Sequence, residues 1–184
     1  QHADHTADTR SVGPFASLGT AMRRDRSAPR GRRMATALVY TAIELIQAIT
    51  DDTAMIELGM DISLSDPGQI EISNKVNLVI LGNGYTIHGQ KSASTAGSVF
   101  WIEDSTVTLE HMRITDGLTT YGGGGISATG STVSLTNVTI VANQATGNDV
   151  LSGGGISVSY STINMVSCVI SENIALSSSS SIGG

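Results

Sequence analysis

The chain has 184 residues, enough for one domain with a substantial hydrophobic core, and it contains 21 glycines but few aromatic (4%) and few charged (14%) side chains. This composition argues against a helical bundle and favours short strands joined by tight turns. A single cysteine excludes an internal disulfide, and no apolar run approaches the ~20 residues that a membrane-spanning helix needs.

The net charge of −6 is unevenly distributed along the chain. Residues 1–33 carry seven arginines and three acids, a charge of +4, whereas residues 34–184 carry three basic residues and thirteen acids, a charge of −10. We therefore divide the sequence into an Arg-rich extended arm, 1–34, and an acidic domain, 35–184. The partner-binding candidates in the arm are Arg23, Arg24, Arg26, Arg30, Arg32 and Arg33.

The composition of the arm leaves three interpretations open. It is a solvated tail, the remnant of a targeting peptide for an organelle, or a segment that docks on an acidic partner. Phe15 is its only aromatic residue, so stacking on bases has little to use. A protein partner or larger assembly is therefore the stronger hypothesis, and nucleic acid the weaker one.

The first regular element is predicted just after residue 41. Thr41 and Glu44 form a capping box, in which the threonine hydroxyl accepts a hydrogen bond from the Glu44 amide. Apolar residues follow at helical spacing, among them Leu45 and Ile49, so we expect a short helix over about 42–50. A helix ahead of many strands would cover the first open edge of a stack.

Alternating apolar residues between Ile56 and Ile87 predict several short strands, and beyond them one pattern occurs three times. The repeated motifs are Ser105-Thr-Val-Thr-Leu109, Ser131-Thr-Val-Ser-Leu135 and Ser161-Thr-Ile-Asn-Met165, spaced 26 and 30 residues apart. Three short strands per repeat predict an all-β fold, a right-handed parallel β-helix of about five rungs with a short N-terminal capping helix. A left-handed hexapeptide helix would repeat near ~18 residues, so the observed spacing of 26 and 30 residues disfavours it.

Aligning the repeats sorts side chains into columns. Phe100, Ile126 and Ile156 share an inward column, and Cys168 falls in another with Met112 and Val138, which makes it a core residue rather than a nucleophile. The only tryptophan, Trp101, falls in an outward column with Ser127 and Ser157. It is a candidate for binding a partner or stacking on a sugar, unless the loop at 88–97 covers it.

The connections between strands carry Gly and Asn at repeating positions. Asn143 and Asn173 occupy equivalent turns, where they are expected to adopt the left-handed conformation and stack their amides from rung to rung. Gly124 and Gly154 belong to glycine blocks that mark turns between rungs, because no lysine and helix follow as in a phosphate-binding loop. After Ala175 no helix or charged strand closes the stack, so we expect further sequence or another molecule to cover that edge.

Charged side chains are densest in the first repeat, where the candidates for chemistry are Glu103, Asp104, Glu110, His111, Arg113 and Asp116. The alignment places Glu103 and Asp104 beside Thr129 and Gly130, so neighbouring rungs supply no second carboxylate for acid–base catalysis. His2, His5 and His88 have no partners at metal-binding spacing. We expect no enzymatic activity, no metal site and no cofactor. Asn137-Val-Thr139 is a formal glycosylation sequon, relevant only to an exported eukaryotic protein.

Two motifs resemble a known group of proteins. Gly123-Gly-Gly-Ile126 and Gly153-Gly-Gly-Ile156, with the Ile-x-x-Asn turns ending at Asn143 and Asn173, resemble the repeats of chlamydial polymorphic outer-membrane proteins and related bacterial β-helix proteins, which carry Phe in place of that Ile. The resemblance covers roughly residues 38–184 and implies a β-helix with an extracellular or cell-surface location. Pectin-lyase-like enzymes, adhesins and structural repeats share this architecture, so it does not fix the function.

Three functions follow from these observations. The leading hypothesis is a non-enzymatic structural or interaction module, a rigid acidic β-helix tethered to a larger assembly by its basic arm. The second is a fragment of a secreted or surface adhesin. The third is a carbohydrate-active enzyme of the polysaccharide-lyase kind, with polysaccharide as its ligand.

Overall fold

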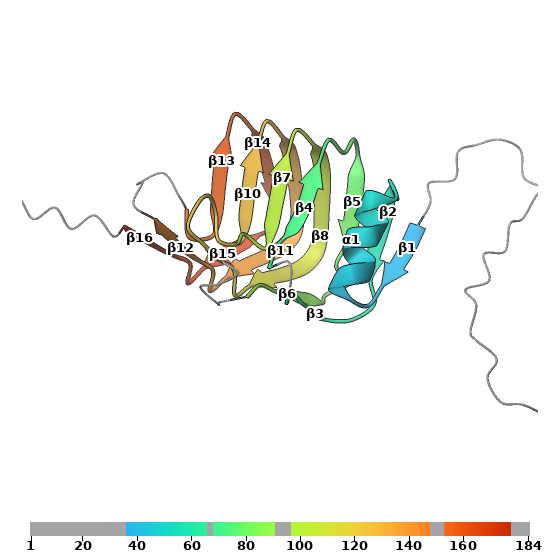
Figure 1. Cartoon of the computed structure of the whole chain (residues 1–184), viewed down its shortest axis with the longest axis horizontal. Helices are drawn as coiled ribbons and strands as arrows, with labels where there is room; N and C mark the ends of the chain where they lie inside the picture. Colours follow the sequence, from blue (N-terminus) through green and yellow to red (C-terminus); the bar gives the residue numbers. More distant parts are fainter. Residues whose placement is uncertain (1–35, 66–67, 91–96, 148–152, 178–184) are drawn as a thin grey trace, which may run out of the picture. The chain divides into compact units, whose positions relative to one another are not determined.

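The computed structural model describes residues 36–65, 68–90, 97–147 and 153–177, all of which belong to one compact unit, Arg33–Gly184. Segment 1–34, with the six candidate arginines, lies outside the described residues. In the described part the strands wind into a parallel β-helix of about four rungs (Figure 1). The predicted fold class, a right-handed parallel β-helix with one short helix, is confirmed.

Each rung consists of short strands joined by tight turns. The first rung contains β4 (Ile70–Ser73), β5 (Leu78–Leu81) and β6 (Thr86–His88), and the second contains β7 (Phe100–Glu103), β8 (Thr106–Thr115) and β9 (Leu118–Thr119). The third contains β10 (Ile126–Thr129), β11 (Thr132–Val141) and β12 (Gln144–Gly147). The fourth contains β13 (Ile156–Ser159), β14 (Thr162–Val166), β15 (Val169–Ser171) and β16 (Ile174–Ser177).

Three further strands precede the first rung: β1 (Thr36–Val39), β2 (Met55–Leu58) and β3 (Ile62–Ser63). β2 pairs with β5 and β3 with β6, while β1 only adds a strand beside β2. The predicted number of about five rungs is therefore too high, because these strands extend one sheet without completing a rung.

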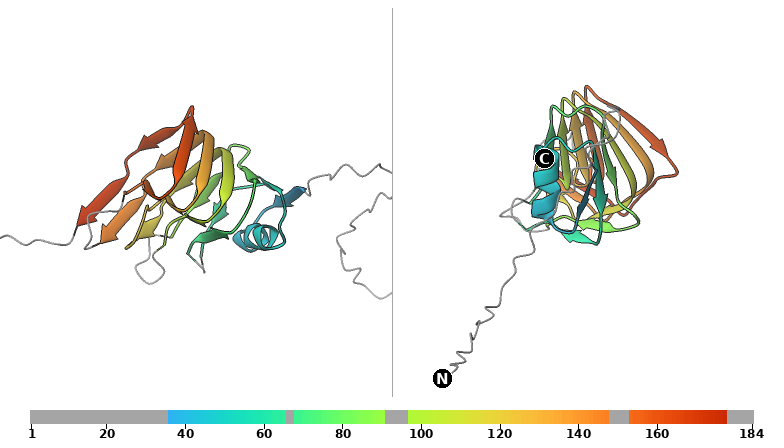
Figure 2. Two further views of the ribbon diagram at one scale, coloured as in Figure 1. Left: turned by 90° about the horizontal axis from the view of Figure 1, so that it is seen from above. Right: turned by 90° about the vertical axis from the view of Figure 1, so that its right-hand side faces the viewer.

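The strands of successive rungs pair in parallel to form three sheets, as Figure 2 shows from two sides. One sheet runs β13-β10-β7-β4, another β16-β12-β9, and the largest contains β1-β2-β5-β8-β11-β14 with β15, β3 and β6 attached. Within β8 and β11 the backbone takes positive φ at His111 (52°) and Asn137 (52°), and Ser167 (54°) divides β14 from β15 at the same place.

The side-chain columns follow the predicted register. Ile126 pairs with Phe100 on one side and with Ile156 on the other, and Leu135 pairs with Leu109 and Met165 in the same way. Because inward side chains stack on their counterparts, each rung buries its apolar residues against its neighbours. Phe100, Ile126 and Leu135 are accordingly buried.

The helix α1 (Ala42–Thr50) covers the N-terminal end of the stack, as predicted. It packs against β1, β2 and β4 through its buried residues Leu45, Ala48 and Ile49. Thr41 Oγ1 accepts from the Glu44 N–H at 3.2 Å, and the Glu44 carboxylate accepts from the N–H of Tyr40 at 2.7 Å. The capping box thus reaches one residue further back than the usual pattern.

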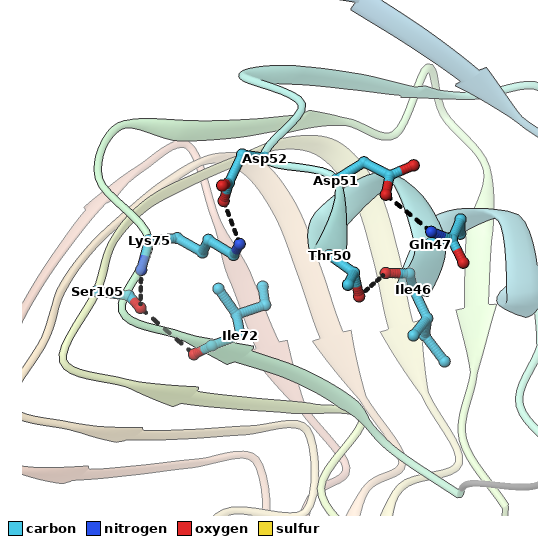
Figure 3. A network of polar contacts seen from close by, with 8 residues as sticks. All are labelled: Ile46, Gln47, Thr50, Asp51, Asp52, Ile72, Lys75 and Ser105. Carbon is cyan, nitrogen blue, oxygen red and sulfur yellow. Dashed lines mark hydrogen bonds and ion pairs between the residues drawn. The ribbon is translucent and has the colours of Figure 1, made fainter.

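Polar contacts hold the end of α1 and the first rung together (Figure 3). Gln47 donates to Asp51 at 2.8 Å near the C-terminus of the helix, and the neighbouring Asp52 forms an ion pair with Lys75. The backbone N–H of Lys75 donates to Ser105 Oγ at 3.0 Å, which connects this region to the second rung.

Candidate interaction surface

A serine ladder runs through the turns that precede the long strands. The N–H of Ser105 donates to Ser131 Oγ at 3.0 Å, and the N–H of Ser131 donates to Ser161 Oγ at 2.8 Å. Each hydroxyl also donates to the backbone carbonyl of the residue two positions earlier in the sequence, at 2.7–2.8 Å. The first residue of every repeat therefore satisfies backbone groups that the sheets leave unpaired at the corner.

An asparagine ladder lies at the corner between the largest sheet and the sheet of β9, β12 and β16. Asn143 Oδ1 accepts from the N–H of Gly117 at 2.9 Å, and Asn143 Nδ2 donates to the carbonyl of Ile114 at 3.1 Å. Asn173 Oδ1 accepts from the N–H of Asn143 at 3.0 Å. The amides interact from rung to rung, but the left-handed conformation predicted for them belongs to the preceding residues, Ala142 (φ 55°) and Glu172 (φ 56°).

The glycine blocks allow close backbone approach. A Cβ atom on Gly124 would lie 2.5 Å from the carbonyl oxygen of Gly154, and one on Gly154 would lie 2.5 Å from the backbone of Ile174. Real Cβ atoms do not approach backbone this closely, so both positions need the small residue although neither has a positive φ.

Trp101 lies on β7 in the predicted register, but its surroundings differ from those expected of an outward column. The side chain is only partly exposed, and Ser127, its neighbour on the next rung, is buried. The turn at Gly122 lies over this pair, since a Cβ there would be 2.4 Å from Ser127 Oγ and 3.8 Å from the Trp101 ring. A role for Trp101 in binding a partner stays a prediction; residues 91–96 of the loop expected to cover it lie outside the described residues.

The charged side chains of the second rung do not converge. Glu103 lies beside Thr129, and Glu110 beside Thr136, as the alignment predicts. The sequence did not reveal one pair, His88 Nδ1 and Asp116 Oδ2 at 3.1 Å. Among the described residues no three His, Cys, Asp or Glu side chains lie close enough to hold a metal ion.

A shallow groove of about 730 Å³ follows the bend of the largest sheet. Its polar lining comes from successive rungs and consists of Asn83, Glu110, His111, Arg113, Asn137 and Thr139. His111 Nε2 lies 3.1 Å from the side-chain nitrogen of Asn137, and His111 Nδ1 lies 4.0 Å from the Glu110 carboxylate. The groove therefore offers donors and acceptors, arranged along the β-helix axis.

The fourth rung differs from the rungs before it. Its inward residues Val158, Met165 and Ile170 are about half exposed, although the residues they stack on, Ala128, Leu135 and Ile140, are buried. Cys168 is partly buried against the core, with its Sγ 3.5 Å from the carbonyl of Leu135. No strand among the described residues pairs with the far edge of β13, β14 or β16.

Although Ser157, Thr162 and Asn164 are polar, several outward positions of the fourth rung are apolar as well. We call four of them the apolar rim: Val166 (60% exposed), Val169 (53%), Ile174 (51%) and Leu176 (53%). Their register partners on the third rung are all polar, namely Thr136, Thr139, Gln144 and Thr146. Val166 and Val169 lie on the largest sheet, and Ile174 and Leu176 on β16 of the neighbouring sheet. Large exposed apolar patches mark interaction sites, whereas scattered apolar residues do not.

The sequence contained a signal for this surface that column-by-column reading missed. In the outward column Arg113–Thr139–Val169 the residues change from charged to polar to apolar toward the C-terminus. The column Glu110–Thr136–Val166 changes in the same way. One such change is unremarkable, because single apolar residues on a surface are common. All four apolar rim residues fall within the last repeat, where they replace polar residues of the third rung.

The helix α1, with nine residues, is too short to cross a membrane, and the described residues contain no other helix. Comparisons of the chain with protein-family models, with curated proteins and with solved structures found no match.

Proposed function

We propose that this chain is a non-enzymatic structural or interaction module, a rigid acidic β-helix that joins a larger assembly through its fourth rung and its basic arm. The apolar rim carries the proposal: four outward positions are half exposed and apolar where the preceding rung has polar residues. Apolar area that a partner removes from water contributes roughly 25 cal/mol per Å² to the binding free energy.

The rigidity of the module supports this function. Serine and asparagine ladders and close glycine contacts link each rung to the next, so the rim is held on a fixed frame. A surface that is ordered before binding loses less conformational entropy on association than a flexible one.

The rim is tested by binding of a neutral apolar dye such as Nile red to the full chain. We expect dye fluorescence with the unaltered protein and loss of most of it in the double variant Val166→Glu/Ile174→Glu. Glutamate fits sterically at position 166, since Glu110 occupies the same column two rungs earlier. The matched control is Leu38→Glu/Ile43→Glu, which changes two exposed apolar residues at the other end and adds the same charge. Equal dye binding by both double variants would contradict the proposal.

The arm forms the second part of the proposal, supported by the charge difference between residues 1–33 (+4) and residues 34–184 (−10). We propose Arg23, Arg24, Arg26, Arg30, Arg32 and Arg33 as its contact residues, with a protein as partner. The test expresses the tagged full chain, or a tagged chain lacking residues 1–33, in cells of the source organism and compares the proteins that co-purify with each. Loss of the co-purifying assembly on deletion supports the tether, and full retention refutes it.

A second candidate function rests on the groove at the bend of the sheet. Side chains such as Glu110, His111 and Arg113 offer hydrogen-bonding groups to a polysaccharide, and the resemblance to pectin-lyase-like proteins and to adhesins points the same way. A screen for depolymerisation of acidic and neutral polysaccharides separates enzyme from module. Turnover that falls in Asp104→Ala, Asp116→Ala or Glu110→Gln would favour the enzyme; we expect none.

A further inference from the structure

We propose that the outer face of the sheet β13-β10-β7-β4 holds a site for an arginine-containing segment of a partner protein, centred on Trp101 and two glutamates, Glu71 and Glu103. The three residues lie on β4 and β7, on a different sheet from the apolar rim and from the groove. The site therefore goes beyond the proposed function and does not depend on it.

Strand pairing brings these three side chains together on the solvent side of the sheet. Glu71 on β4 is the register partner of Trp101 on β7, and the two strands lie side by side in Figure 1. Paired positions on neighbouring strands are about 5 Å apart, and Glu103, two residues further along β7, is about 7 Å from Trp101 on the same face. The alternate residues of β7, Phe100 and Ile102, are buried in the core, so Trp101 and Glu103 face outward.

The ring of Trp101 is held from one side of its strand and borders a carboxylate on the other. The turn at Gly122 lies over Ser127 on the third rung, and a Cβ at this glycine would be 3.8 Å from the ring. Glu71, on the first rung, lies on the opposite side of β7. The indole is only partly covered. A fixed, partly exposed ring next to a carboxylate offers a preordered surface for a cation.

Within the described residues, no lysine or arginine neutralises these carboxylates. That part of the chain contains two such side chains: Lys75, which forms its ion pair near the end of α1, and Arg113 on β8 in the largest sheet. Both glutamates are exposed, and the hydrogen bond that Glu71 accepts from Ser73 is long, at 3.5 Å. Both carboxylates are thus accessible to a cation from another molecule.

Arginine is the side chain that this combination fits best. Its planar guanidinium stacks on an aromatic ring and donates to carboxylates at the same time, whereas the lysine ammonium is a compact, strongly hydrated charge. The charge of −10 on residues 34–184 attracts basic segments. In an extended segment, side chains two residues apart lie about 7 Å apart on one face. Arginines at alternate positions therefore match Trp101 with Glu71 first and Glu103 second.

The test uses Trp101 as its own reporter, because the chain contains no other tryptophan. The full chain is titrated with a blocked five-residue peptide in which arginine alternates with glycine, from about 10 μM to about 10 mM, a range that covers millimolar dissociation constants. We expect a saturable change in the fluorescence of Trp101. Binding should be at least about threefold weaker when lysine replaces arginine, and absent when uncharged citrulline replaces it.

Charge-matched variants separate this site from a general attraction of basic peptides to an acidic protein. Glu71→Gln/Glu103→Gln removes both carboxylates of the site and should weaken binding by about tenfold. Glu57→Gln/Glu110→Gln removes the same charge from β2 and β8 of the largest sheet and should change the affinity by about twofold or less. Circular dichroism of each variant checks that the β-helix remains folded.

Three results would overturn the inference. They are a fluorescence of Trp101 that the arginine peptide leaves unchanged at every concentration, an equal loss of affinity in the two double variants, and equal binding of the citrulline peptide. Each of them leaves the apolar rim untouched, because Nile red binding tests the rim with substitutions on other sheets. Failure of this site and failure of the proposed function are therefore distinguished by separate measurements.

Discussion

The third and fourth rungs are close copies in sequence, yet their side chains meet different surroundings. Leu135 and Met165 occupy one inward column, but Leu135 is buried between two rungs and Met165 is half exposed. Outside, Thr136 and Thr139 give way to Val166 and Val169. The third rung is stacked on both sides, whereas the fourth repeats its strand pattern with half-exposed inward residues and four apolar residues on its outside.

Under the proposed function, this difference is the way in which one rung of a repeat protein acquires a binding surface. The inward columns and ladder residues are kept because every rung needs them to pair with its neighbour. The outward positions carry no such constraint, so aliphatic residues replace threonine and glutamine there without altering the strand pairing. If so, matched substitutions on the two rungs should have different effects, and the following measurements test this.

The largest contrast in stability is expected in the inward column. Leu135→Ala should lower the free energy of unfolding by about 2–5 kcal/mol, because it removes a buried side chain and leaves a cavity. Met165→Ala should cost about 1 kcal/mol or less in the monomer, because half of that side chain is already in water. Urea denaturation at low protein concentration measures both values. Equal losses would mean that the fourth rung is covered in the same way as the third.

The asparagine ladder should show a smaller contrast. Asn143→Ala leaves the N–H of Gly117 without its acceptor in a buried site and should cost about 1–3 kcal/mol. Asn173→Ala should cost about 1 kcal/mol, since its amide is partly exposed to water. The exposed Asn164→Ala provides a control that should change the unfolding free energy little. A larger loss for Asn173→Ala than for Asn143→Ala would contradict this order.

The serine ladder predicts a milder effect. Ser131→Ala removes the acceptor of the Ser105 N–H in a buried corner and should cost about 1 kcal/mol. Ser161→Ala removes the matching bond to Ser131 in a less buried corner, so about half of that loss is expected. Thermal unfolding monitored by circular dichroism compares the two. An undetectable effect of Ser131→Ala would show that the hydroxyl is not needed there.

The smallest effect on stability is expected on the apolar rim itself. Val166→Glu and Val169→Glu should each change the free energy of unfolding of the monomer by about 0.5 kcal/mol or less, because both side chains already face solvent. Urea denaturation at low protein concentration gives these values. Losses of several kcal/mol would instead assign the rim residues to the folded core.

Much of the frame could be predicted from the sequence, because repeated spacing reports directly on stacking. The motifs at Ser131 and Ser161 superpose at an offset of 30 residues, and their inward columns pair in the predicted register. The same reasoning failed where the offset changes. His88 and Asp116, 28 residues apart, lie on rungs whose lengths do not match the later spacing, so their pairing was not visible.

The surface was harder to predict than the frame. A column alignment shows whether a side chain points inward or outward, but it does not show what covers it. Ser127 falls in an outward column and is nevertheless buried, because the turn at Gly122 folds over it. In the same way, the four residues of the apolar rim fall in outward columns, but only the structure shows that about half of each side chain is exposed.

Nile red binding by the full chain and by two charge-matched double variants tests most directly that the fourth rung is an interaction surface. The account predicts that Val166→Glu/Ile174→Glu loses most of the dye fluorescence, while Leu38→Glu/Ile43→Glu keeps it. Equal fluorescence from both variants would contradict it.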